Sequence, residues 1–338
     1  MRPYVLRDLS GIIWPSGKSS QVIPHVQEDT SSMTARNIWF IGTGKFAALC
    51  LEGLIRHNMA FRKIITGNPA RSGRSGKENP SSVELAASRL GLDVTRTGKL
   101  TKNTSLLHEL ESDSPDVIFV VDFGQIIREP ILSHMCLNIH PSLLPEYRGA
   151  APIQRALLDG KNYTGVSVFR LASEMDAGDI IAQRRIDIHD TDNASDLYAK
   201  LAWIGSDLAF MSVEYLDAIT FTPQDDKLAA YAPKLDKSEF ALDFTMTAKK
   251  FTDTVRALDM SGGAYAVIAG KRVKIWRSVV REDLKADTPG QVMECVNNPV
   301  ISCCDFGVEL VDVQSEGKNR VTGAEWARGV RLKNGDTV

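Results

Sequence analysis

The sequence predicts an α/β protein with a doubly wound, mostly parallel sheet, followed by a smaller domain of short strands. Two observations carry this prediction. Over the first two-thirds of the chain, short apolar runs typical of buried strands alternate with helical patterns. Towards the C-terminus, five short β-rich runs are separated by turn residues. A length of 338 residues also favours two domains.

The alternating region begins with an apolar run that reads as a buried parallel strand. Gly91 is expected to stop one of the helices, because glycine readily adopts the left-handed conformation that ends helices. The predicted strands cover residues 37–41, 62–66, 116–121, 137–140 and 165–171, and the predicted helices cover 46–57, 82–90, 151–158 and 194–219. Ligands of such sheets bind beyond the carboxyl ends of the strands, where Phe123, Asn138 and His140 fall.

The two ends of the chain follow other patterns. Residues 1–35 hold three prolines and many polar residues, so we expect a disordered extension with no catalytic role, although a weak targeting peptide or a misassigned start codon would fit as well. Residues 222–242 hold two prolines and many charges and are interpreted as a linker. The five short strands beyond a helix at 248–257 indicate an OB-like β-barrel. The predicted domains are the extension (1–35), a catalytic domain (36–221), the linker (222–242) and the barrel (243–336).

Composition excludes several classes of protein. The formal charge of -2 gives no global sign of nucleic-acid binding, so any RNA contact must come from local basic patches. No apolar run approaches the about 20 residues that a membrane helix needs. The five cysteines form no Cys-x-x-Cys pair, which argues against a zinc site and favours reduced thiols.

A glycine-rich turn follows the first strand. Gly42 to Ala47 fits the dinucleotide fingerprint G-x-G-x-x-A, which also requires an acidic residue about 20 positions further on. That region reads Ile65 to Pro69 and contains no acid. The turn is therefore interpreted as a tight strand-to-helix connection and not as a site for NAD.

Asn138 and His140 are the most informative pair in the chain. Residues two apart on a strand point to the same face, so an amide and an imidazole lie side by side. Asp176 is a candidate third member. These groups suit attack of an amine on a carbonyl, because the amide and the imidazole stabilise an oxyanion and the carboxylate holds the imidazole. A satisfied polar pair at a strand end is the alternative.

These residues and their surroundings resemble the folate-dependent formyltransferases. The family's Asn-x-His maps onto Asn138 and His140, and its catalytic Asp maps onto Asp176 in the segment 175–179. The family's Ser-Leu-Leu-Pro and Arg-Gly-Ala-Ala-Pro-Ile segments stand at residues 142–145 and 148–153. The resemblance runs from about residue 37 to about residue 336 and also implies an OB-like C-terminal domain.

The resemblance implies formyl transfer from 10-formyltetrahydrofolate, without a metal, to the α-amino group of methionine on initiator tRNA. Asn138, His140 and Asp176 would be catalytic, whereas Asp179 would be structural. The folate would lie against Phe123, Gly124, Gln125 and Ile126, and against Ser142, Leu143, Leu144 and Pro145. Gly124 would let the main chain approach a flat ligand closely, and an ordinary β–α turn at residues 122–127 is the alternative.

Two basic segments are candidates for tRNA contact. The resemblance places a basic loop that enters the acceptor-stem region at residues 69–77, where Arg74 is the first match and Arg71 and Lys77 are further candidates. Lys271 and Lys274 lie on a predicted strand whose outward face would be basic. Both segments could instead be solvated surface charge.

Other readings remain open at this stage. A formyltransferase acting on a small amine, such as an amino-sugar nucleotide or glycinamide ribonucleotide, would share the catalytic residues. A noncatalytic tRNA-binding protein is a further alternative, which the intact Asn138, His140 and Asp176 disfavour. We expect a monomer without membrane association, in the cytoplasm of a bacterial cell or in the mitochondrial matrix.

Overall fold

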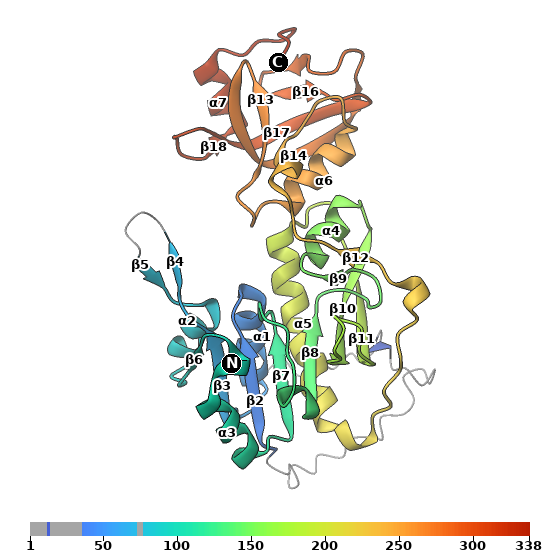
Figure 1. Ribbon diagram of the computed structural model, residues 1–338. Coiled ribbons are helices and arrows are strands. Elements are labelled where there is room, and N and C mark those ends of the chain that lie inside the picture. Colours follow the sequence, from blue (N-terminus) through green and yellow to red (C-terminus); the bar gives the residue numbers. More distant parts are fainter. Residues whose placement is uncertain (1–11, 14–35, 73–76) are drawn as a thin grey trace. The chain divides into compact units, whose positions relative to one another are not determined.

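The computed structural model describes residues 12–13, 36–72 and 77–338 (Figure 1). The chain divides into two units. The first contains Met1–Gly149, Thr164–Asp187 and Tyr198–Tyr231, and the second contains Ala150–Tyr163, Ile188–Leu197 and Ala232–Val338. The second unit therefore includes two segments from the range 150–197 as well as the C-terminal part of the chain.

An eight-stranded sheet forms the centre of the first unit. In order across the sheet, its strands are β1 (Ile12–Ile13), β11 (Ile180–Asp187), β10 (Tyr163–Arg170), β8 (Cys136–His140), β7 (Val117–Val121), β2 (Ile38–Gly42), β3 (Lys63–Gly67) and β6 (Thr95–Thr97). From β8 to β6 all neighbours are parallel, whereas β10 is antiparallel to β8. The prediction of a doubly wound, mostly parallel sheet is confirmed.

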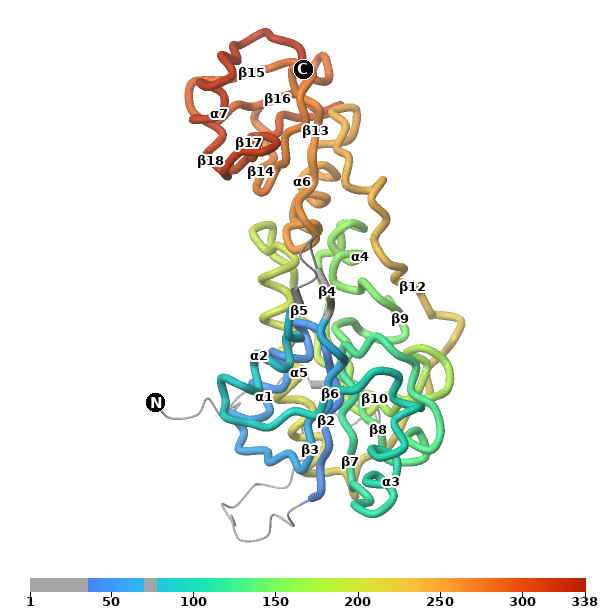
Figure 2. The backbone as a smooth tube through the Cα atoms, turned by 60° about the vertical axis from the view of Figure 1, so that its left-hand side comes forward, coloured from blue at the N-terminus to red at the C-terminus, as the bar shows by residue number. Residues whose placement is uncertain are grey.

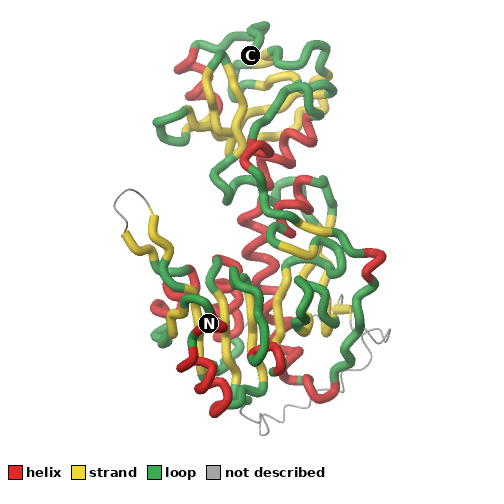
Figure 3. Tube along the Cα trace, viewed as in Figure 1, coloured by secondary structure: helices red, strands yellow, loops and turns green. Residues whose placement is uncertain are grey.

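The parallel strands are buried on both faces, as their continuous apolar sequences require. Every residue of β2 and β7 is buried. The helices of this unit are α1 (Lys45–Arg56), α2 (Ser82–Arg89), α3 (Thr104–Asp113) and α5 (Ala194–Glu214) from Tyr198 onward (Figure 3). Within the described ranges, every helix is too short or too polar to cross a membrane.

The turn between β2 and α1 shows why glycine follows the first strand. The amides of Thr43 and Gly44 both donate to the carbonyl oxygen of Asp122 at 3.2 Å. A Cβ built on Gly44 would lie 1.8 Å from Oδ2 of Asp122, so a larger residue there would displace the Asp122 carboxylate. The chain's own packing therefore accounts for this glycine of the dinucleotide-like fingerprint.

Several elements of the first unit were not predicted from the sequence, among them β11, β6 and α3. β6 has only three residues, and α3 has a weakly amphipathic sequence. Asn103 marks the start of α3, because its side chain accepts a hydrogen bond from the amide of Leu106 at 3.1 Å. Asparagine three residues before an apolar position was the available signal.

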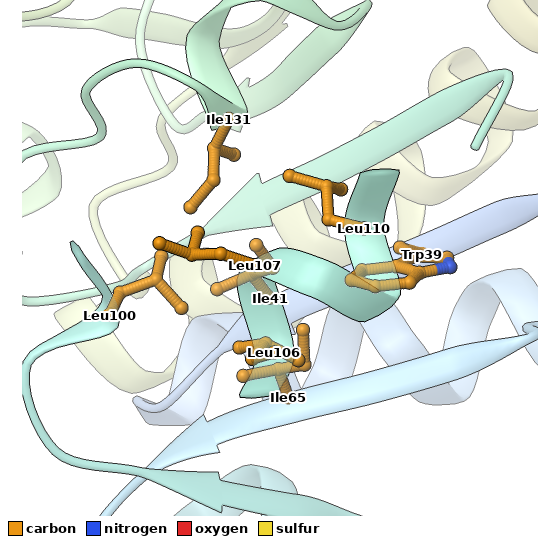
Figure 4. A pocket seen from close by; sticks show the side chains of 8 residues that line it. All are labelled: Trp39, Ile41, Ile65, Leu100, Leu106, Leu107, Leu110 and Ile131. Carbon is orange, nitrogen blue, oxygen red and sulfur yellow. The ribbon is translucent and has the colours of Figure 1, made fainter. Parts of the chain in front are cut away.

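α3 completes one apolar cluster against the sheet. Figure 4 shows a small gap in this cluster, lined only by apolar or aromatic side chains: Trp39, Ile41, Ile65, Leu100, Leu106, Leu107, Leu110 and Ile131. The polar edge of Trp39 is satisfied, since its Nε1 donates to Asp113 at 2.7 Å. The cluster lies beneath the loop that follows β7, because Phe123 and Ile127 of that loop pack against it.

The basic segment after β3 forms a hairpin. Its strands β4 (Ala70–Ser72) and β5 (Lys77–Asn79) pair antiparallel and run side by side in both views (Figures 1 and 2). Arg74 lies outside the described residues.

At one edge of the eight-stranded sheet, β1 pairs antiparallel with β11, so Ile12 and Ile13 form a strand within the segment that was expected to be a disordered extension.

The second unit is built on an antiparallel sheet. Its strands, in order, are β13 (Ala264–Ile268), β14 (Lys271–Lys285), β17 (Phe306–Ser315), β16 (Val300–Ser302) and β15 (Val292–Glu294), and β18 (Val321–Thr322) pairs with β17. β14 is much longer than the short strand that was predicted around Lys271 and Lys274. Three helices accompany the sheet: α4 (Pro152–Leu158), α6 (Ala248–Ala257) and α7 (Gly323–Val330). The antiparallel C-terminal β domain agrees with the predicted fold class.

α7 was missed, although its capping box is visible in the sequence. Thr322 accepts a hydrogen bond from the amide of Glu325 at 3.2 Å, and Glu325 accepts one from the amide of Thr322 at 3.0 Å. The segment 222–242, interpreted as a linker, contains short regular elements. It contains the short helices η4 (Asp226–Leu228) and η5 (Lys237–Phe240) and the strand β12 (Tyr231–Ala232), which pairs with β9 (Arg148–Gly149).

Candidate active site

Pairing with β10 fixes the face on which Asn138 and His140 lie. Phe169 stands opposite Asn138 in the register, and residues directly opposite share a face. The ring of Phe169 also meets the ring of His140 edge-on, at a centroid distance of 6.4 Å. The three side chains therefore share one face of the sheet. His140 is 5% exposed, and Asn138 is half-buried.

Asp176 reaches this face from the loop between β10 and β11. Its Oδ2 lies 3.8 Å from Nδ1 of His140 and accepts a hydrogen bond of 2.8 Å from the amide of Gly149. Asp179 of the same loop offers a main-chain contact instead, because its carbonyl accepts from the amide of Arg170 at 2.9 Å. The structure thus brings Asp176, and not Asp179, to His140.

The backbone of this loop is held tightly. Asp176 has a φ of 52°, a left-handed conformation that costs a residue other than glycine on the order of 1–3 kcal/mol. Two residues later, a Cβ built on Gly178 would lie 1.8 Å from the carbonyl oxygen of Arg170. Glycine is therefore required at 178, and the close approach there helps to hold Asp176 in its conformation.

A main-chain contact decides which nitrogen of His140 can act. Nε2 lies 2.9 Å from the carbonyl oxygen of Tyr147, which can only accept, so Nε2 carries a proton. In the neutral ring, Nδ1 then offers a lone pair beside Asp176. In the doubly protonated ring, Nδ1 donates towards that carboxylate or towards an oxyanion. Tyr147 was not identified from the sequence, because a carbonyl contact leaves no mark on residue type.

This arrangement can support attack of an amine on a carbonyl carbon. Nδ1 of His140 and the carboxylate of Asp176 can together receive the amine's proton. The side-chain amide of Asn138, on the same face, can donate to the carbonyl oxygen as it gains charge. Within the described residues, no three His, Cys, Asp or Glu side chains are grouped to hold a metal ion.

Several polar groups of the segment 142–145 are hydrogen-bonded to neighbouring residues of the protein. The hydroxyl of Ser167 donates to the carbonyl of Ser142 at 2.6 Å and accepts from the amide of Leu144 at 3.0 Å. The hydroxyl of Ser142 donates to the carbonyl of Glu146 at 2.6 Å. Ser142 and Leu144 are buried, whereas Leu143 and Pro145 are half-buried. Leu143 and Pro145 are therefore the members of this segment with surface to offer to a ligand.

The loop after β7 combines a fixed side chain with an exposed apolar surface. Gln125 accepts from the amide of Leu100 at 3.0 Å and donates to the carbonyl of Gly98 at 2.6 Å, so its side chain holds the loop in place. Ile126 is 59% exposed, and Phe123 is half-buried against the core. A Cβ built on Gly124 would meet no described atom within 4 Å. The loop thus fits a flat ring better through Ile126 and the open main chain of Gly124 than through Gln125.

The basic residues predicted for tRNA contact fall in both units. Arg71 and Lys77 belong to the strands of the β4–β5 hairpin, where Arg71 stands opposite Glu78 and Lys77 opposite Ser72. In the second unit, Lys271 and Lys274 are separated by an odd number of positions, so the two lie on opposite faces of β14. Lys274 therefore does not share a face with Lys271.

Arg272, which the sequence analysis passed over, shares the face of Lys274. Its guanidinium lies 3.6 Å from the ring centroid of Tyr265, and Lys274 is paired in register with Tyr265. The indole of Trp276, on the same face, donates to the side chain of Gln314 at 3.1 Å. The outward face of β13 and β14 thus combines cations with aromatic rings, whereas Val273 and Ile275 between them are buried.

Comparison with known families agrees with this geometry. A family model described as formyl transferase matches residues 36–212, and a model described as formyl transferase, C-terminal domain, matches residues 234–331. The chain belongs to the formyl transferase family. The resemblance inferred from Asn138, His140 and the segments around them is confirmed.

Curated relatives align with the chain over almost their whole length. A methionyl-tRNA formyltransferase of Natranaerobius thermophilus is 35% identical over 88% of this chain and 97% of the relative. A methionyl-tRNA formyltransferase of Caldicellulosiruptor saccharolyticus is 33% identical over 89% of this chain and 99% of the relative. These alignments cover both units.

Solved structures share the fold at lower identity. The sugar 3N-formyl transferase WlaRD, crystallised with dTDP and 5-N-formyl-THF, has a TM-score of 0.61 at 20% identity, covering 84% of this chain and 99% of its own. HypX from Aquifex aeolicus, in complex with tetrahydrofolic acid, has a TM-score of 0.60 at 17% identity and covers 90% of this chain. The chain spans about half of HypX, since the match covers 49% of that protein.

Proposed function

We propose that this chain transfers the formyl group of 10-formyltetrahydrofolate to the α-amino group of methionine on initiator tRNA. The observation that carries the proposal is the proximity of the side chains of His140 and Asp176. His140 lies on the same strand as Asn138, and the chain belongs to the formyl transferase family. The names of relatives that align over nearly their full length support methionyl-tRNA as the acceptor.

In the proposed reaction, the methionine amine attacks the formyl carbon and a tetrahedral oxyanion forms. Asn138 donates to this oxyanion. The amine's proton passes to Nδ1 of His140, which Asp176 stabilises once the ring is positively charged. Cleavage of the bond to folate nitrogen N10 then releases formylmethionyl-tRNA, and N10 takes up a proton to give tetrahydrofolate. Burial of His140 and Asp176 strengthens each of these electrostatic contacts.

The proposed folate site lies along the loop after β7 and the segment 142–145. Ile126 and Gly124 offer an exposed apolar and main-chain surface for the pterin ring. Leu143 and Pro145 offer further apolar contact. In this proposal Gln125, Ser142 and Leu144 act indirectly, because their hydrogen bonds or burial hold the two segments in shape.

The tRNA would be held by the two basic segments. Arg71, Arg74 and Lys77 of the hairpin segment are proposed for the acceptor stem. Lys274, joined by Arg272, is proposed for the phosphate backbone, and Lys271 would contribute from the other face of β14. We further propose that the protein acts as a monomer, in the bacterial cytoplasm or in the mitochondrial matrix.

The experiment that tests the proposed function follows radiolabelled formyl from 10-formyltetrahydrofolate. Purified full-length protein is offered charged initiator methionyl-tRNA, a dTDP-amino sugar and glycinamide ribonucleotide in parallel. We expect the label to enter methionyl-tRNA with at least tenfold higher kcat/KM than either small amine. Preference for a small amine would overturn the assignment of the acceptor, and absence of transfer to all three would overturn the proposed function.

A further inference from the structure

Gln224 connects the predicted linker to the loop that carries Asp176. Its side-chain Nε2 donates to the carbonyl oxygen of Asp176 at 2.9 Å and to that of Gly178 at 2.6 Å. One amide group therefore holds two carbonyls of the same loop. The same two segments are also joined next to this contact, because Thr222 and Ile180 exchange main-chain hydrogen bonds of 2.8 and 2.9 Å.

Arg148 determines the orientation of the Gln224 amide. Its Nε donates to Oε1 of Gln224 at 3.0 Å, and its Nη2 donates to Asp226 at 2.8 Å. A guanidinium can only donate, so the amide must turn its oxygen towards Arg148 and its NH₂ towards the loop. The Arg148 side chain is 3% exposed. Loss of a hydrogen-bond acceptor by a guanidinium buried to this extent would carry a large free-energy penalty.

The same strand, β9, holds the carboxylate of Asp176. The amide of Gly149, directly after Arg148, donates to Oδ2 of Asp176. Arg148 acts on the main chain of the loop through Gln224, and Gly149 acts on its side chain. A two-residue strand thus controls both the backbone and the carboxylate of one residue.

We propose that Gln224 is a positioning residue for Asp176, and this inference rests on the proposed function. The left-handed backbone of Asp176 is unfavourable by itself and persists only where its surroundings over-determine it. The two hydrogen bonds from Gln224 span the residues from 176 to 178 and so hold this conformation. Without them the loop relaxes, and the carboxylate moves away from Nδ1 of His140, from which it is 3.8 Å distant.

Gln224→Glu tests this proposal with almost no change in shape. Glutamate still accepts from Arg148, but it has no NH₂ group, and its second oxygen repels the carbonyls of Asp176 and Gly178. We expect kcat for formyl transfer to fall between about tenfold and a hundredfold, because small misplacements of catalytic groups have effects of that size. KM for 10-formyltetrahydrofolate should change less than threefold. Gln291→Glu, at an exposed glutamine before β15, is the matched control and should behave as wild type.

A double-mutant comparison separates positioning from a general structural role. If Gln224 acts through Asp176, adding Gln224→Glu to Asp176→Asn should slow the enzyme less than twofold further. Full additivity of the two effects would overturn the proposal, as would wild-type kcat in Gln224→Glu.

Hydrogen exchange of the peptide covering residues 170–180 provides a readout that needs no activity. Gln224→Glu should speed exchange in this peptide, and Gln291→Glu should not. Unchanged protection would overturn the positioning role even if the wild-type protein transferred no formyl group. Absence of transfer by the wild type would count against the proposed function alone.

Discussion

At the scale of single residues, the structure restricts which ring nitrogen of His140 is available for chemistry. Its Nε2 is bound to the carbonyl of Tyr147, so chemistry is left to Nδ1. The distance of 3.8 Å from Nδ1 to Oδ2 of Asp176 is longer than a hydrogen bond. Uptake of a proton at Nδ1 would turn this contact into a charge-assisted hydrogen bond.

Asn138→Ala should lower kcat by about 10²–10³, because loss of one oxyanion donor typically has that effect. The melting temperature should change little, since Asn138 is only half-buried although it lies in the middle of β8. Steady-state formyl transfer and thermal unfolding of the same preparation measure both quantities. Asn162→Ala, at an exposed asparagine before β10, provides the control. A kcat within threefold of wild type would remove Asn138 from the mechanism.

At the scale of elements, the second unit gathers distant segments through one arginine of α4. Arg155 donates from Nη2 to Glu239 at 2.9 Å and from Nε to the carbonyl of Pro233 at 3.1 Å. Lys250 of α6 also donates to the carbonyl of Leu158 at the end of α4 at 2.6 Å. The helix α4 is therefore tied to η5 and to α6, which explains why residues 150–163 belong with the C-terminal part of the chain.

Glu239→Gln should make the second unit less stable near pH 7 and flatten its acid dependence. The hydrogen bond from Arg155 holds the pKa of Glu239 below its usual value. A carboxylate whose pKa is lower in the folded state stabilises the protein above the unfolded pKa, and this contribution is lost as pH falls through the folded pKa. The free energy of unfolding of the wild type should exceed that of the variant by about 1 kcal/mol at pH 7. This difference should shrink below about pH 4.

Urea unfolding of the full chain at pH 7 and at about pH 3.5 measures this effect. Glu316→Gln, at an exposed glutamate after β17, is the control with the same charge change and should match wild type at both pH values. A difference between wild type and Glu239→Gln that is independent of pH would contradict the electrostatic explanation.

At the scale of the whole molecule, charge is nearly balanced, with 40 basic and 42 acidic residues. Binding of a polyanion such as tRNA must then depend on local segments, and each unit contains one. The β4–β5 segment belongs to the first unit, and the face of Arg272 and Lys274 belongs to the second. Phosphate contacts release counterions, so tRNA binding through these segments must weaken as salt rises.

Arg74→Ala should lower kcat/KM for methionyl-tRNA at low salt, and it should make the dependence of log(kcat/KM) on log[salt] less steep by about one unit. Binding of 10-formyltetrahydrofolate should be unchanged. Arg74→Lys should restore part of the activity, because an ammonium group lacks the planar fork of a guanidinium.

Initial rates from 50 to 300 mM KCl provide the measurement, and Lys333→Ala, at an exposed lysine beyond α7, removes one positive charge elsewhere. An equal dependence of log(kcat/KM) on log[salt] in wild type and Arg74→Ala would show that this loop makes no phosphate contact. That result would favour a small amine as the acceptor.

The amino-acid pattern was enough to predict the parallel part of the sheet and the shared face of Asn138 and His140. Both depend on local periodicity: apolar runs mark buried strands, and a spacing of two places side chains on one face. Short or weakly amphipathic elements such as β6 and α3 escaped, because a few residues of mixed polarity carry little periodic signal. The same alternation along β14 places Lys271 and Lys274 on opposite faces.

The groups that surround Asn138 and His140 become apparent only in the folded chain. Tyr147 contributes a carbonyl, Gly149 contributes an amide, and Gln224 lies in a segment that reads as a linker. Main-chain groups are the same in every residue, and a glutamine among prolines and charges has no pattern of its own. Such contacts arise when segments distant in sequence are brought together, so the composition of each segment alone cannot predict them.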